Sequence, residues 1–126
     1  MPMPTREELD PQVTFRDQLE AAGDGPVILI NTFTVAPEEA GAMLDTWTAD
    51  SAVMRRQPGF IRAQLHRGVA GSSVFVNYAV WESAAHLKAA ASTPEFLAAI
   101  ARTPGSAVAR PHLFEKVAVP GVCVAI

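Results

Sequence analysis

Three stretches of the chain carry β-branched and aromatic residues in the two-residue alternation that is typical of β-strands. Residues 27–35 (VILINTFTV) lie between two prolines, and residues 60–67 and 74–81 flank a loop of glycines and serines at 68–73. A last strand is expected over residues 111–119. The 27–35 segment is mostly apolar on both faces, so we predict that it lies inside the sheet rather than at its edge.

Between these strands the apolar period changes to that of a helix. Apolar residues recur at three- and four-residue steps after Pro37, a residue that suits a first helical position, until Gln57-Pro58-Gly59 ends the pattern. Residues 84–91 favour a second helix because they are rich in alanine, and Thr93-Pro94 starts a further helical segment. The order strand–helix–strand–strand–helix–strand predicts an α+β, ferredoxin-like fold, an antiparallel sheet with its helices on one face.

The two ends of the chain differ from this pattern. Residues 1–25 are predicted to form an N-terminal extension with a short helix within residues 6–20, and residues 120–126 a C-terminal tail. The turn Gly23-Asp24-Gly25-Pro26 marks the start of the domain, which is therefore expected over residues 26–119.

Composition narrows the range of partners. The chain has 126 residues, 49% of them hydrophobic, which predicts one globular domain. Its net charge of −3 disfavours a nucleic-acid partner, and no apolar run reaches the ~18 residues that a membrane helix needs. A single cysteine, Cys123, excludes an intrachain disulfide, and no secretory leader is recognisable, so we expect a cytoplasmic protein.

Charge is unevenly distributed along the chain. Residues 1–50 hold ten acidic and two basic residues, whereas residues 51–126 hold three acidic and eight basic ones. Solvated helix faces would explain this distribution, and so would a mildly basic pocket for an anionic or phenolic ligand.

The sheet face that the helices leave uncovered is expected to be too apolar for solvent. It would carry Thr32, Thr34, Val74, Val76, Tyr78 and Val80. An exposed apolar patch of this breadth usually marks a protein contact, so a homodimer joined sheet to sheet is predicted.

Two asparagines interrupt strand faces that should be apolar. Asn31 lies between apolar neighbours in the first strand, Asn77 does so in the third, and Trp81 follows Asn77 on the same face. If this face looks at the helices, two carboxamides and an indole N–H point into one apolar cavity. A buried amide without a partner costs roughly 1–3 kcal/mol, so each side chain either bonds the main chain or awaits a ligand.

The segments GFIRAQLHRG and VFVNYAVWES, with the Gly/Ser loop between them, resemble the antibiotic-biosynthesis monooxygenase family. The resemblance extends over residues 26–119 and implies a dimeric α/β barrel of ferredoxin-like subunits. Members of this family include small oxygenases that convert anthrone-type polyketides to quinones with O₂ and without metal, flavin or haem. The implied function is therefore a cofactor-independent monooxygenase for an anthrone-type or other electron-rich polycyclic phenol.

The resemblance also assigns residues to roles. It places Asn31, Asn77 and Trp81 at the catalytic positions of the pocket, and it implies neither a cofactor nor a metal. His66, at the end of the second strand, is a candidate general base, although a solvated histidine at a strand end is the simpler interpretation. The expected substrate contacts are Phe33, Trp47, Phe75 and Arg62. Trp47 would also be explained as a core residue.

Three other functions remain open. Haem-degrading monooxygenases of the same fold carry a histidine further along the second helix, roughly where this chain has Ala91, whereas His86 lies near the helix start. Polyketide cyclases of similar fold would not consume O₂. A dimer that binds a small ligand without catalysis is the third possibility.

Overall fold

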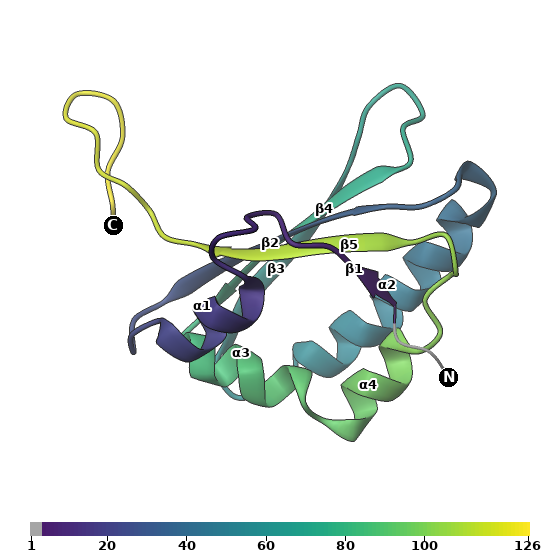
Figure 1. The fold of residues 1–126 in the computed structure, drawn as a ribbon, viewed down its shortest axis with the longest axis horizontal. Helices are drawn as coiled ribbons and strands as arrows, with labels where there is room; N and C mark the ends of the chain where they lie inside the picture. Colours follow the sequence, from purple (N-terminus) through teal and green to yellow (C-terminus); the bar gives the residue numbers. More distant parts are fainter. Residues whose placement is uncertain (1–3) are drawn as a thin grey trace.

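The computed structural model describes residues 4–126 as a five-stranded sheet with helices α2, α3 and α4 packed on one face (Figure 1). The strands lie in the order β1-β5-β2-β4-β3, and all neighbours are antiparallel except β1 and β5. The predicted α+β, ferredoxin-like arrangement is therefore confirmed. The elements are β1 (Thr5–Arg6), α1 (Phe15–Ala21), β2 (Val27–Thr34), η1 (Pro37–Glu39), α2 (Ala40–Met54), β3 (Phe60–Arg67), β4 (Val74–Trp81), α3 (Ala84–Ala91), α4 (Pro94–Ile100) and β5 (Val108–Phe114).

Strand β2 is central, as its two apolar faces predict, because it pairs with β4 on one side and β5 on the other. Its register sets Asn31 directly opposite Asn77 of β4. Side chains directly opposite on neighbouring strands share one face and lie in contact range. The two asparagines that the sequence singles out are thus immediate neighbours.

The last strand begins earlier than predicted, at Val108 rather than Pro111, and ends at Phe114. The proline suggested a strand start because it lacks an N–H. The main-chain groups of Ala109 and Leu113 point away from β2, because they bond to Glu7 and Gln18 of the N-terminal extension. Pro111 lies midway between them, so its nitrogen also points to the outer edge of β5. No bond to β2 is lost there, so proline is tolerated within the strand.

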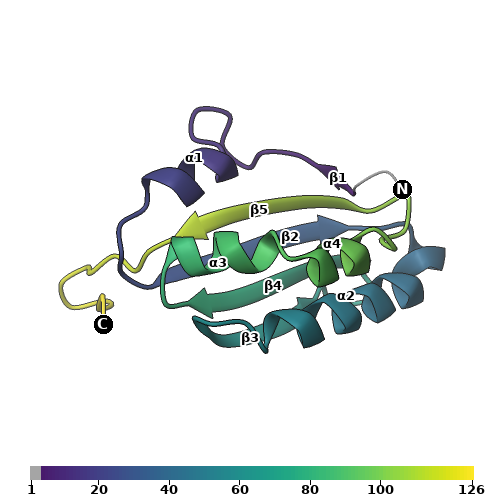
Figure 2. The same ribbon diagram turned by 90° about the horizontal axis from the view of Figure 1, so that it is seen from below.

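The N-terminal helix is shorter than predicted and begins at Phe15. Thr14 caps it reciprocally with Asp17, since the Asp17 N–H donates to Thr14 Oγ1 at 3.1 Å and the Thr14 N–H donates to Asp17 Oδ2 at 3.2 Å. Arg6, which was expected in this helix, instead lies in β1 beside β5, so the extension packs along the edge of the sheet (Figure 2).

Gln18 of α1 continues this cover along β5. Its Nε2 donates to the Leu113 carbonyl at 2.9 Å, and its Oε1 accepts from the Leu113 N–H at 2.8 Å. One side chain therefore replaces the two hydrogen bonds that a neighbouring strand would make. Beyond β5 the expected strand to residue 119 does not form; the chain turns through a bridge between Val119 and Cys123 and projects from the body (Figure 1).

The buried core consists of two clusters rather than one. Phe75 at the start of β4 belongs to a cluster with Phe33 and Met43, whereas Trp81 at its end belongs to a second cluster with Leu87. Asn77 lies between them on the same strand face. The apolar core is therefore divided at the level of the asparagine pair.

The turn before β3 depends on glycine. Gly59 has a φ of 87°, in the left-handed region, and a Cβ there would overlap the imidazole of His86. We expect G59A to lower the free energy of unfolding by about 2 kcal/mol or more, measured by urea denaturation. The matched control is G41A, since Gly41 is helical with open space around it; this change should raise stability by up to about 1 kcal/mol. Equal effects of the two substitutions would contradict this account.

Candidate functional site

A cavity of about 420 Å³ lies between the sheet and the helices. Its sheet side is formed mainly by alternate residues of the two central strands, with a few residues of β3 and β5, and its helix side by α2 together with residues of α3 and α4. The sheet contributes Leu29, Asn31, Phe33, Asn77, Ala79 and Trp81, and the helices contribute Met43, Trp47, Asp50, Met54, Phe96 and Ile100. Its volume falls within the roughly 300–1,000 Å³ of small-molecule sites, and its wall is mostly apolar.

The carboxamides of Asn31 and Asn77 are the polar groups on the sheet side. The Oδ1 atom of each is buried and accepts no hydrogen bond. An amide oxygen in this state costs roughly 1–3 kcal/mol relative to a hydrogen-bonded one. Of the two alternatives that the sequence leaves open for these side chains, a bond to the main chain is thus absent at both oxygens.

Trp81 closes the sheet side beyond Asn77. Only 1% of its surface is exposed, and its ring meets Phe60 edge to face, with centroids 5.4 Å apart and an interplanar angle of 85°. Both residues line the cavity. The structure therefore brings Asn31, Asn77 and Trp81 together at one wall.

Of the expected substrate contacts, Phe33 and Trp47 line the cavity, but Phe75 and Arg62 do not. Phe75 is the cross-strand partner of Phe33 and stacks on its ring, with the ring centroids 5.4 Å apart. Arg62 lines a neighbouring hollow of about 410 Å³ together with Arg55, and the two spaces share Trp47, Ser51, Phe60 and Ala63 in their walls. Arg62 could therefore meet only a part of a ligand that reaches into this second hollow.

The structure does not bring His66 to the cavity. It pairs with Val76 on the sheet face opposite the helices, and its side chain is exposed. Among residues 4–126, no histidine lines the cavity.

Asp50 of α2 is an ionisable group of the cavity that the sequence pattern did not single out. It follows Trp47 by three residues and precedes Met54 by four, so it lies on the apolar face of the helix. Burial raises the pKa of its carboxyl to about 7, although the Ser51 hydroxyl, which donates to Oδ1 at 3.3 Å, acts in the opposite direction. Its helical spacing from Trp47 and Met54 could have indicated this position in the sequence. Acidic residues on helix surfaces are so common, however, that this spacing alone does not distinguish Asp50.

Residues of the N-terminal extension complete the wall. Pro4, Arg6 and Phe15 line the cavity, and the Arg6 guanidinium carbon lies 5.6 Å from the centre of the Phe15 ring. The extension is therefore part of the site, and Arg6 brings a positive charge to it.

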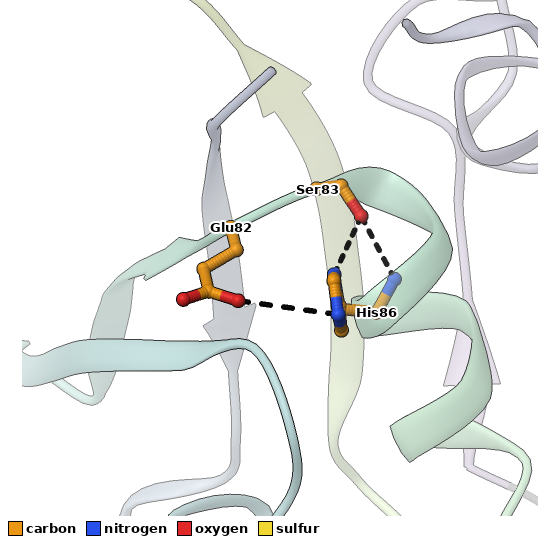
Figure 3. A network of polar contacts seen from close by, with 3 residues as sticks. All are labelled: Glu82, Ser83 and His86. Atoms are coloured by element: carbon orange, nitrogen blue, oxygen red, sulfur yellow. Dashed lines mark hydrogen bonds and ion pairs between the residues drawn. The ribbon is translucent and has the colours of Figure 1, made fainter. Parts of the chain in front are cut away.

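A second polar group, at the start of α3, combines a serine, a histidine and a glutamate (Figure 3). Ser83 Oγ lies 2.7 Å from His86 Nδ1, and His86 Nε2 lies 3.9 Å from Glu82. The serine oxygen, however, also accepts the His86 N–H as the N-cap of α3, and none of the three residues lines the cavity. The residue types match a hydrolase triad, but the geometry is that of a helix cap.

Two further observations on the described residues concern metal ions and membranes. In the part of the chain from residue 4 onward, His, Cys, Asp and Glu side chains nowhere gather in threes as a metal site requires. Within the same part, every helix is too short or too polar to cross a lipid bilayer.

The fold agrees with the comparisons with known proteins. The model of the antibiotic biosynthesis monooxygenase family matches residues 26–102, more than half of the chain, and the chain belongs to this family. The structure is similar to SnoaB, a cofactor-independent oxygenase from Streptomyces nogalater, with 27% identity and a TM-score of 0.65 over 77% of this chain and 98% of that one.

Other solved structures show the same similarity. An asparagine-to-alanine variant of SnoaB is 28% identical, with a TM-score of 0.64 over 79% of this chain and 99% of that one. PA3566 from Pseudomonas aeruginosa is 26% identical, with a TM-score of 0.65 over 75% of this chain and 96% of that one. No curated protein matches the chain.

The buried amide oxygens without partners should lower the stability of the free protein. Leucine is similar in size to asparagine but has no polar group that needs a hydrogen bond. N77L should therefore raise the free energy of unfolding by about 1 kcal/mol in urea denaturation. The control Q12L changes an exposed amide of the N-terminal extension and should stay within about 0.5 kcal/mol of the wild type. A marked loss of stability in N77L would mean that the amide is satisfied in the free protein.

Proposed function

We propose that the protein is a cofactor-independent monooxygenase that oxidises an anthrone-type or other electron-rich polycyclic phenol to a quinone with O₂. The observation that carries this proposal is the pair of unpartnered carboxamides, directly opposite each other, in an otherwise apolar cavity. The similarity to a cofactor-independent oxygenase supports the same conclusion.

The chemistry of the wall selects the ligand class. A carboxamide accepts a hydrogen bond through its oxygen and donates through its nitrogen, so each asparagine can hold a phenol hydroxyl or the phenolate that replaces it. The apolar side chains around Asn31 and Asn77 suit fused aromatic rings. A flat guest with oxygens at its edge would satisfy both amides and fill the space between the sheet and α2.

These groups act most strongly when charge develops on the guest. Loss of a benzylic proton from an anthrone leaves an anion that is delocalised onto its ring oxygens. N–H donors of Asn31, Asn77 and the Trp81 indole stabilise this charge more in a dry cavity than water would. The anion transfers an electron to O₂, and recombination forms a carbon-bound peroxide. Loss of water then gives the carbonyl, so that one CH₂ and one O₂ become one C=O and one H₂O.

The residues present do not suit the haem alternative. Ala91 lines the cavity where the haem-degrading enzymes of this fold would carry their histidine. His86 is held by Ser83 at the helix cap, away from the cavity wall. With no imidazole among the described lining residues, this chain offers haem no axial nitrogen ligand.

We further propose that two copies of the chain associate through the open sheet face, in the cytoplasm. Val74 is 39% exposed on this face, and the projecting tail exposes Val122 and Ile126 at 80% and 94%. Apolar surface of this kind is covered when two sheets meet. A second copy would also offer each tail a surface to pack against.

The function is tested by oxygen consumption. With dithranol or emodin anthrone, the wild type should consume one O₂ per quinone formed, whereas N31A/N77A should lose about 10²–10³-fold or more in kcat/KM while keeping its fold. Q12A, a truncation of an exposed amide outside the cavity, is the matched control and should keep full activity. Product identified by absorbance without O₂ uptake would indicate a cyclase, and a ligand-induced rise in Tm without turnover would indicate a binding protein.

The dimer is tested by mass in solution. V76E places a charge on the open sheet face and should shift the particle from twice the chain mass to the chain mass in light scattering. A89E adds the same charge to an exposed position of α3 on the helical side and should leave the mass unchanged. Dissociation by A89E but not V76E would place the interface on the helices.

A further inference from the structure

We propose that Asp50 is the general base of the reaction, taking the benzylic proton of the bound phenol. This inference rests on the proposed function and assigns a role that His66, exposed on the opposite sheet face, has no geometry to fill. Asp50 instead lines the cavity itself.

The position of Asp50 is complementary to that of the asparagines. Asn31 and Asn77 belong to the sheet, whereas Asp50 belongs to α2, on the helix side of the same cavity. A flat guest between the two layers would thus meet the oxygen-binding amides on one side and a carboxylate on the other. Within the described part of the chain, this is the one acidic side chain that lines the cavity.

The surroundings tune this carboxylate for proton transfer near neutrality. Desolvation raises its pKa to about 7, close to the value at which a base is both deprotonated and strong enough. From β1, Arg6 lines the same cavity, and from α2 and β3, Arg55 and Arg62 line the adjoining hollow. Helix α4 and strands β2 and β4 contribute no titratable group to the cavity. None of the three arginines lies within 4.0 Å of Asp50 as an ion pair.

The carboxyl group of Asp50 can carry out every proton transfer of the reaction. The carboxylate forms an O–H bond as the benzylic C–H bond breaks, and the electron pair stays on the guest. Carbon is then oxidised as O₂ is reduced to the carbon-bound peroxide, which takes the proton back from Asp50. In the last step the carboxylate removes the remaining proton of the same carbon as the O–O bond breaks. The departing hydroxide takes up that proton and leaves as water.

The first test compares D50N with D45N, which changes an exposed acid of the same helix. D50N should lower kcat about 10²–10³-fold, whereas D45N should match the wild type. The rise in Tm caused by the product quinone should persist in D50N, because the amides still bind it. A D50N enzyme with wild-type kcat would overturn the proposal.

The pH profile separates a base from a structural residue. Wild-type kcat/KM, which reports the free enzyme, should rise with pH to a plateau with a midpoint near 7, and D50N should lack this limb. S51A removes the hydrogen bond that favours the carboxylate, so the midpoint of its pH profile should move to higher pH. A D50N enzyme that is slow but keeps the wild-type limb would assign the base elsewhere.

A measurement without turnover checks the titration itself. The folded protein favours the protonated form of Asp50. The contribution of this group to the free energy of unfolding is therefore full below about pH 4 and is lost as the pH rises through about 7. The difference in unfolding free energy between wild type and D50N should therefore fall between these values and then level off. If the wild type shows no oxygen uptake but this titration appears, the proposed reaction fails while the buried carboxyl stands. Uptake without the titration overturns the base alone.

Discussion

The site depends on two buried hydrogen-bond acceptors that have no partner in the free protein. Asn31 and Asn77 oppose each other on the two central strands, and their carboxamide oxygens are buried without partners. Folding accepts this cost because the flanking core clusters, around Phe75 on one side and Trp81 on the other, hold the strands in register. The gap between the clusters is the cavity. A guest that brings its own donors and acceptors would regain the energy that the free protein forgoes, and the proposed oxygen-edged aromatic substrate has such groups.

Much of this arrangement follows from residue spacing. The alternation in residues 27–35 and 74–81 predicts both central strands and puts Asn31, Asn77 and Trp81 on one face. It cannot predict that the asparagines face each other, because register depends on which strands pair. It also leaves open whether an amide bonds the main chain, and that distinction decides between a structural residue and a binding group.

Other parts of the site depend on distances that the sequence does not contain. Asp50 looks like one of many surface acids until the helix is docked and its face meets the cavity. His66 has the right chemistry for a base, but strand alternation turns it to the opposite face. Phe33 and Phe75 are the same residue type on the same sheet face, yet only Phe33 lines the cavity. Pro111 shows the converse, since a residue that usually ends strands is harmless where its nitrogen faces outward.

The Gln18 side chain that bonds both main-chain groups of Leu113 has a consequence for self-association. An uncovered strand edge is a template on which further chains can add and polymerise. Here β1 covers one part of that border and Gln18 another, while the bulge near Ile61 distorts the opposite border. Growth of a continuous intermolecular sheet is thereby discouraged on both flanks, which leaves the open sheet face as the surface for the proposed pairing of two copies.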